Sequence, residues 1–162
     1  HYHADYIAGH TVLRDGKAIP MQAVKGCPET FNVAHLREKL QRIRTQNILW
    51  PIYDRTIHDV IEDQVEVTGD IVLIEGNWLL LKDAEWRDLR ACCDDAVMIT
   101  ADEEMLKHRL IARKVQGGAR REAAEAFYEK SDGPNVTRVL RDSQSADLVL
   151  RLTEDNDYER VN

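Results

Sequence analysis

Residues 71–78 indicate the fold class most clearly in this sequence, and they read Ile71-Val72-Leu73-Ile74-Glu75-Gly76-Asn77-Trp78. Four consecutive branched aliphatic residues predict a strand that is buried on both faces, as in the middle of a parallel sheet. Glu75 then lies at the carboxyl end of that strand, where open α/β sheets bind their ligands. Gly76 allows the backbone to turn there and to approach a ligand closely. An acid in this place commonly holds Mg²⁺ on nucleotide phosphates, but a loop glutamate after any buried strand gives the same short pattern.

Strand and helix patterns alternate along the rest of the chain after residue 75. Apolar strands are predicted at 96–100 and 148–152. The helices between them are predicted at 85–92, from Asp102 to Lys114, at 120–130 and at 136–143, with a break at Asp132-Gly133-Pro134. This order of elements is typical of a parallel α/β sheet.

The part before residue 71 has a different pattern, with more turn formers. Asp15-Gly16 between two short apolar segments predicts a small hairpin. A helix is predicted from Val33 to Gln46, with Thr30 or Asn32 as its cap. The short apolar segment 47–50 is predicted to stop at Pro51, and alternating valines at 65 and 67 indicate an edge strand or a hairpin arm.

Composition limits the possible classes of protein. The 162 residues are 43% hydrophobic and 31% charged, which fits one globular domain. A formal net charge of −7 argues against a general nucleic-acid binder, although a local basic cluster can still bind a small anion. The sequence has no apolar run of the roughly 20 residues that cross a bilayer and no signal-peptide pattern. Cys27, Cys92 and Cys93 show neither a disulfide framework nor zinc spacing, so we expect reduced thiols and a cytoplasmic protein.

Two clusters besides Glu75 carry residues suited to chemistry. Residues 51–55 with His58 interleave aromatic, acidic, basic and imidazole groups, which suits recognition of a polar ligand with several hydroxyls. An ordinary surface loop with charge pairs is the alternative. Arg109 and Arg113 share a helix face just before Gly117-Gly118, where cations can stabilise phosphate charge. A solvated basic helix end is the alternative for that pair.

A further loop, with Lys25-Gly26, Pro28 and Glu29, either lines a pocket or only shapes a turn. Its residues also open an ordered series of motifs. The series runs through Lys25-Gly26-x-Pro28-Glu29-Thr30-Phe31, Trp50-Pro51-x-Tyr53-Asp54-Arg55-x-x-His58-Asp59, residues 71–81, Arg109-Leu110-x-x-Arg113 and Ser131-Asp132-Gly133-Pro134-Asn135. Taken together and in this order, these motifs resemble the uridine kinase-like branch of the P-loop kinases. The likeness extends to bacterial fructose-transport-system kinases and to pantothenate kinase.

The resemblance implies a doubly wound parallel sheet and ATP-dependent phosphorylation of a small-molecule hydroxyl. It implies that Glu75 helps to organise Mg²⁺ and that Arg109 and Arg113 are lid arginines acting on the nucleotide phosphates. It also implies a set of ligand-binding residues, which are Phe31, Tyr53, Asp54, Arg55 and His58 for the substrate and Asn135 for the nucleotide.

The departures from the family pattern are as informative as the matches. The sequence contains no G-x-x-x-x-G-K-[ST] loop, whose amides and lysine would hold the phosphates. His1-Tyr2 resembles the end of an Asp-Gly-Phe-His-Tyr motif whose Asp is the usual catalytic base. We therefore expect the C-terminal portion of a P-loop kinase fold, with a substrate-side region at 1–70 and the acid-bearing strand, lid and last strand at 71–162. Such a fragment is expected to be inactive alone.

Several alternatives stay open at this stage. Val60 replaces a base-reading Arg of pyrimidine nucleoside kinases, so nucleoside, sugar and pantothenate all remain as acceptors, and ATP and GTP as donors. A non-catalytic ligand-binding or regulatory domain derived from a kinase is the second hypothesis, and a structural α/β domain is the third. Central strands without their neighbours would expose apolar faces, so we also expect a homodimer or a missing N-terminal segment.

Overall fold

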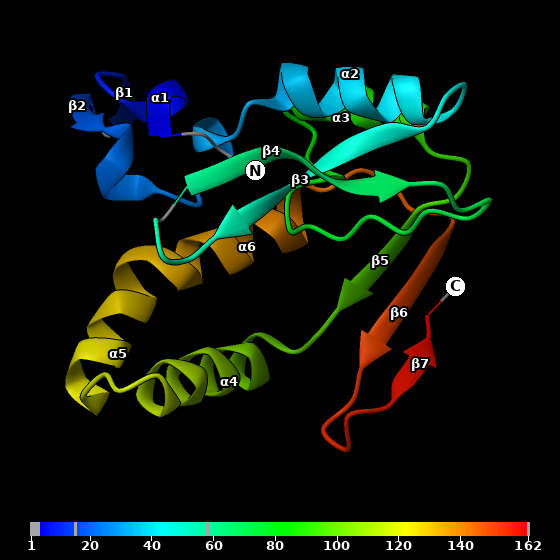
Figure 1. Cartoon of the computed structure of the whole chain (residues 1–162). Coiled ribbons are helices and arrows are strands. Elements are labelled where there is room, and N and C mark those ends of the chain that lie inside the picture. Colours follow the sequence, from blue (N-terminus) through cyan, green and yellow to red (C-terminus); the bar gives the residue numbers. More distant parts are fainter. Residues whose placement is uncertain (1–3, 15, 58, 162) are drawn as a thin grey trace. The chain divides into compact units, whose positions relative to one another are not determined.

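The computed structural model describes residues 4–14, 16–57 and 59–161, and it divides the chain into two compact units, His1–Gly76 and Asn77–Asn162. Figure 1 shows that both units combine helices with strands. The first contains α1 (Ala4–Ile7), β1 (Thr11–Arg14), β2 (Lys17–Pro20), α2 (Val33–Ile43), β3 (Ile48–Asp54) and β4 (Asp59–Val67). The second contains α3 (Ala84–Arg87), β5 (Val97–Thr100), α4 (Glu103–Gln116), α5 (Arg121–Phe127), α6 (Gly133–Asp142), β6 (Leu148–Leu152) and β7 (Tyr158–Arg160).

The first unit is built on two antiparallel hairpins. The predicted hairpin around residue 16 forms from β1 and β2, and Gly16 adopts a φ of 75°, which glycine tolerates at no steric cost. The second hairpin pairs β3 with β4. The predicted stop at Pro51 is wrong, because β3 continues through Pro51 to Asp54.

A large bulge explains how the strand passes Pro51. Trp50 pairs with Val65 and Ile52 pairs with Ile61, so Pro51 alone faces the three β4 residues 62–64. Proline has no N–H to donate to a partner strand, and a bulge removes the need for one. Asp63 completes the bulge with a φ of 57°, a left-handed conformation that Asp tolerates better than most residues.

Helix α2 follows from a clear local signal. The Asn32 side chain accepts a hydrogen bond from the His35 amide at 3.0 Å, so Asn32 rather than Thr30 is the cap. Val33 and Leu40, seven residues apart on one face of the helix, are buried. The helix ends at Ile43, before the predicted Gln46.

Residues 71–74 do not form the predicted buried strand. Ile71 is 86% exposed and Leu73 is 94% exposed, and the segment has no strand assignment. The prediction is wrong here because none of the described strands pairs with this segment, which leaves Val72 and Ile74 partly exposed as well, at 41% and 38%.

The second unit contains the parallel pair expected of an α/β sheet. β5 and β6 run parallel, and β7, which the sequence analysis did not predict, adds to β6 in the antiparallel sense. The Asp147 carboxylate accepts hydrogen bonds from the Ala96 amide at 2.7 Å and from the Arg90 guanidinium at 2.6 Å. These bonds lower the pKa of Asp147, the Ala96 amide being the larger cause, and they join the start of β5 to the start of β6.

Helices α4, α5 and α6 follow one another in the second unit (Figure 1). Ile111, Ala124 and Tyr128 form their buried core. The predicted break at residues 132–134 is wrong, since a π turn at Tyr128–Asp132 leads directly into α6. Pro134 lies in the first turn of α6, directly after the π turn. In the part of the chain described, no helix is long and apolar enough to cross a membrane.

Candidate functional site

The tip of the β3–β4 hairpin carries three of the predicted substrate residues, Tyr53, Asp54 and Arg55. Tyr53 is half-buried near the end of β3, and the Lys25 ammonium donates a hydrogen bond to its hydroxyl at 3.4 Å. The same ammonium lies 5.5 Å from the centroid of the Tyr53 ring, within the range of a cation–π contact. The loop around Lys25 and the hairpin tip therefore meet, although they are far apart in sequence.

Asp54 shapes the turn that follows Tyr53. Its carboxylate accepts hydrogen bonds from the Thr56 hydroxyl at 2.6 Å and from the Thr56 amide at 2.7 Å. The Thr56 hydroxyl is the first cause of a lowered pKa of Asp54, so this carboxylate stays ionised at neutral pH. Arg55 is exposed in the turn, and predicted substrate residue His58 lies outside the described residues.

Two hydrogen bonds of the Thr30 hydroxyl hold the loop that carries Lys25 and Phe31. Thr30 is fully buried, and its hydroxyl donates to the Cys27 carbonyl at 2.7 Å and accepts from the Gly26 amide at 3.1 Å. Gly26 has a φ of 101°, a conformation that favours glycine. Phe31 follows this turn and is half-buried. The loop is thus ordered by its own polar groups.

Glu75 is exposed and follows the uncovered segment 71–74. Among the residues described, no group of three or more His, Cys, Asp or Glu side chains is arranged to hold a metal ion. Mg²⁺ in phosphotransferases is commonly bound by one or two carboxylates together with substrate phosphates and water. The donor chemistry of Glu75 fits that shared arrangement, and the residues described build no complete cage of protein ligands.

The predicted lid residues lie in the second unit. Arg109 is half-buried on α4 and donates to the Thr153 carbonyl at 3.5 Å, while Arg113 is exposed in the last turn. Lys114 is placed differently, because its ammonium lies 3.2 Å from the centroid of the Phe127 ring. Asn135 is half-buried in the first turns of α6. Of the two predicted lid arginines, Arg113 is therefore the more exposed.

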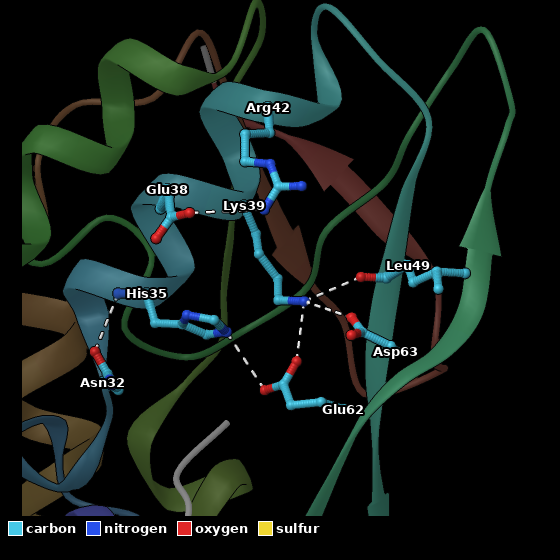
Figure 2. A network of polar contacts seen from close by, with 8 residues as sticks. All are labelled: Asn32, His35, Glu38, Lys39, Arg42, Leu49, Glu62 and Asp63. Carbon is cyan, nitrogen blue, oxygen red and sulfur yellow. Dashed lines mark hydrogen bonds and ion pairs between the residues drawn. The ribbon is translucent and has the colours of Figure 1, made fainter.

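The first unit also contains a polar cluster that the sequence did not predict, shown in Figure 2. Lys39 of α2 is only 7% exposed, and its ammonium lies 2.9 Å from the Glu62 carboxylate. The ammonium also donates to the Leu49 carbonyl at 3.0 Å and to the Asp63 carboxylate at 3.4 Å. The signal available in the sequence was a lysine on an apolar helix face, three residues after Leu36.

Two proteins of known sequence resemble this chain over most of its length. No model of a protein family matches the chain. The uncharacterized protein YggC of Escherichia coli K12 is 47% identical over 138 residues, which cover 85% of this chain and 58% of that protein. The Schizosaccharomyces pombe protein named "Putative uridine kinase C227.14" is 26% identical over 137 residues, with 80% of this chain and 58% of that protein covered. The chain thus spans 58% of the length of these two curated relatives.

A solved structure shares the fold of most of this chain. The crystal structure named "putative fructose transport system kinase" from Silicibacter sp. TM1040 matches with a TM-score of 0.73 and 29% identity, over 78% of this chain and 63% of that one. The structural neighbours are P-loop kinases, so the chain has part of a P-loop kinase fold. Within that class it is similar to the uridine kinase-like branch, as the ordered motifs indicated.

Proposed function

We propose that this chain carries the acceptor-binding and lid elements of an ATP-dependent phosphotransferase that acts on a hydroxyl group of a small molecule. The observation that carries the proposal is the hairpin tip, where Tyr53 contacts Lys25 and is followed by Asp54 and Arg55, in a chain related to kinases. A tip of this composition offers hydroxyl, carboxylate, guanidinium and ammonium groups within a short span. Such groups bind and orient a polyhydroxylated acceptor.

The lid contribution is proposed for Arg109, Arg113 and Asn135. Phosphoryl transfer spreads negative charge over the oxygens of the transferred group, and guanidinium groups close to them stabilise that charge. Arg113 is the side chain that we propose reaches the phosphates, because it is exposed at the end of α4. Arg109 donates to the Thr153 carbonyl, which supports the segment between β6 and β7.

Glu75 is proposed to hold Mg²⁺ jointly with ATP phosphates. The bound metal would supply charge neutralisation at the phosphates. The acceptor classes kept by the proposal are nucleosides, sugars and pantothenate-like alcohols. Val60 in place of a base-reading Arg lowers the expectation for uridine itself.

The test is ADP release by the complete gene product in the presence of ATP, Mg²⁺ and one acceptor from each class. We expect one class to stimulate release and Arg113→Ala to lower kcat about tenfold or more, as for removal of a transition-state donor. Arg121→Ala is the matched control, since Arg121 is an exposed arginine of α5 that pairs with Glu125. The chain of 162 residues alone should bind the same acceptor without turnover, because it has no phosphate-holding G-x-x-x-x-G-K-[ST] loop.

Two outcomes would count against the proposal. If no acceptor stimulates ADP release by the complete gene product, the proposed activity is wrong. Acceptor binding measured by calorimetry, with no turnover in either form, would instead favour the non-catalytic ligand-binding domain.

A further inference from the structure

Lys39 reaches from α2 to both strands of the β3–β4 hairpin at the point where their register shifts. Figure 2 shows its side chain directed to the place where Leu49, Glu62 and Asp63 meet. Leu49 belongs to β3, whereas Glu62 and Asp63 belong to the bulge of β4 opposite Pro51. One ammonium group therefore ties the helix to both strands across the bulge.

The burial of Lys39 makes these contacts necessary rather than incidental. Its side chain is 9% exposed, and a charge removed from water is tolerated only when it is paired and hydrogen-bonded. Hydrogen bonds between charged groups are shorter and stronger than neutral ones, and the 2.9 Å contact to Glu62 is in that range. The bulge and the buried ammonium therefore stabilise each other.

Glu62 is held from two sides by the same helix. Its second carboxylate oxygen lies 3.3 Å from Nε2 of His35, one turn before Lys39 on α2. The His35 backbone amide also donates the cap hydrogen bond to the Asn32 side chain (Figure 2). The contacts with His35 and Lys39 fix the direction of the Glu62 side chain relative to α2, and the Asn32 cap fixes the first turn of that helix.

The bulge separates the hairpin into a base and a tip. The base pairs residues 48–50 with 65–67, and the tip pairs 52–54 with 59–61. A bulge bends a strand and increases its twist, so its geometry sets the direction of the tip relative to the base. We propose that Lys39, through Glu62 and Asp63, is a positioning residue that sets the direction of the tip and thereby the acceptor site. The link to the acceptor rests on the proposed function.

Hydrogen exchange measured by mass spectrometry tests whether Lys39 anchors the hairpin tip, and this measurement does not require enzymatic activity. In Lys39→Met we expect amides of residues 52–61 to exchange about tenfold faster, while the base changes much less. Lys17→Met is the matched control, because Lys17 is an exposed lysine in the other hairpin of the same unit. Glu62→Gln is the second variant in case Lys39→Met does not fold, and it should show the same pattern more weakly.

Two exchange results would overturn the anchor. The first is wild-type exchange at 52–61 in every variant that folds. The second is an equal increase in the exchange rate over the whole first unit, which would show that Lys39 stabilises the unit without setting the direction of the tip.

Kinetics of the complete gene product then test the link to the acceptor. Lys39→Met should raise the KM for the acceptor about tenfold, equivalent to about 1.4 kcal/mol. The KM for ATP and kcat should stay within about twofold of wild type, because Lys39 touches neither reacting group. Equal changes in all three constants would overturn the positioning role. A wild-type protein without turnover would refute the proposed function, while the exchange result would still decide the anchor.

Discussion

Residues 48–54 and residues 71–75 have similar sequences and different structures. Each is an apolar run that ends in a carboxylate, Asp54 in the first and Glu75 in the second. The first run forms β3, in which Ile48 is only 6% exposed. The second run has no strand assignment, and Leu73 is 94% exposed.

The difference between the two runs lies in the availability of a partner strand. β4 begins shortly after β3 ends, so an antiparallel partner is supplied by a short turn. A strand buried on both faces of a parallel sheet needs neighbours that come from distant parts of a chain. An apolar run therefore shows a capacity for burial, and only its neighbours decide whether that burial is realised.

The largest expected effect is a difference in stability between two variants, each of which shortens one apolar side chain in one of the two runs. Ile48→Ala should lower the free energy of unfolding by roughly 2–4 kcal/mol, because it leaves a cavity in a buried position. Leu73→Ala should change it by less than about 0.5 kcal/mol, because an exposed side chain loses little contact. Urea denaturation of both variants measures the difference. Equal losses would mean that segment 71–74 is packed, and the comparison would fail.

A smaller effect is expected at the turn that gives the first run its partner. Since the pKa of Asp54 is lower in the folded chain than its ordinary value of about 3.9, the ionised carboxylate stabilises the turn above that pH. This contribution is lost as pH falls through the lowered folded pKa. Thr56→Val removes the hydroxyl donor and should move the pKa of Asp54 back toward its ordinary value, which NMR titration of the carboxyl carbon measures. Thr45→Val is the control, because the Thr45 hydroxyl donates to a backbone carbonyl instead. A carboxyl pKa unchanged in Thr56→Val would remove the hydroxyl as the cause.

Local signals predicted much of the fold. Asp15-Gly16 indicated the first hairpin, Asn32 indicated the start of α2, and the run at 148–152 indicated β6. Each depends on residues close together in sequence, where turn chemistry, caps and periodicity act. The kinase resemblance likewise rested on short motifs in order, and the comparisons confirm it.

The features that the sequence did not reveal depend on distant contacts. Pro51 marks a strand end in isolation, but a three-residue bulge on β4 accommodates it. Pro134 was expected to break a helix, but the π turn before it places it in a first turn. Lys39 gave only the signal of a charge on an apolar face, since its partners lie on another pair of elements.

The most direct test of the account is the KM for the acceptor in Tyr53→Phe, measured in the complete gene product with its best acceptor. The account predicts an increase of about fivefold to tenfold with little change in kcat, because the hydroxyl that contacts Lys25 is lost from the hairpin tip while the ring remains. Tyr158→Phe, which removes the hydroxyl of an exposed tyrosine in β7, should leave the KM unchanged. A wild-type KM in Tyr53→Phe would contradict the claim that the β3–β4 hairpin tip binds the acceptor.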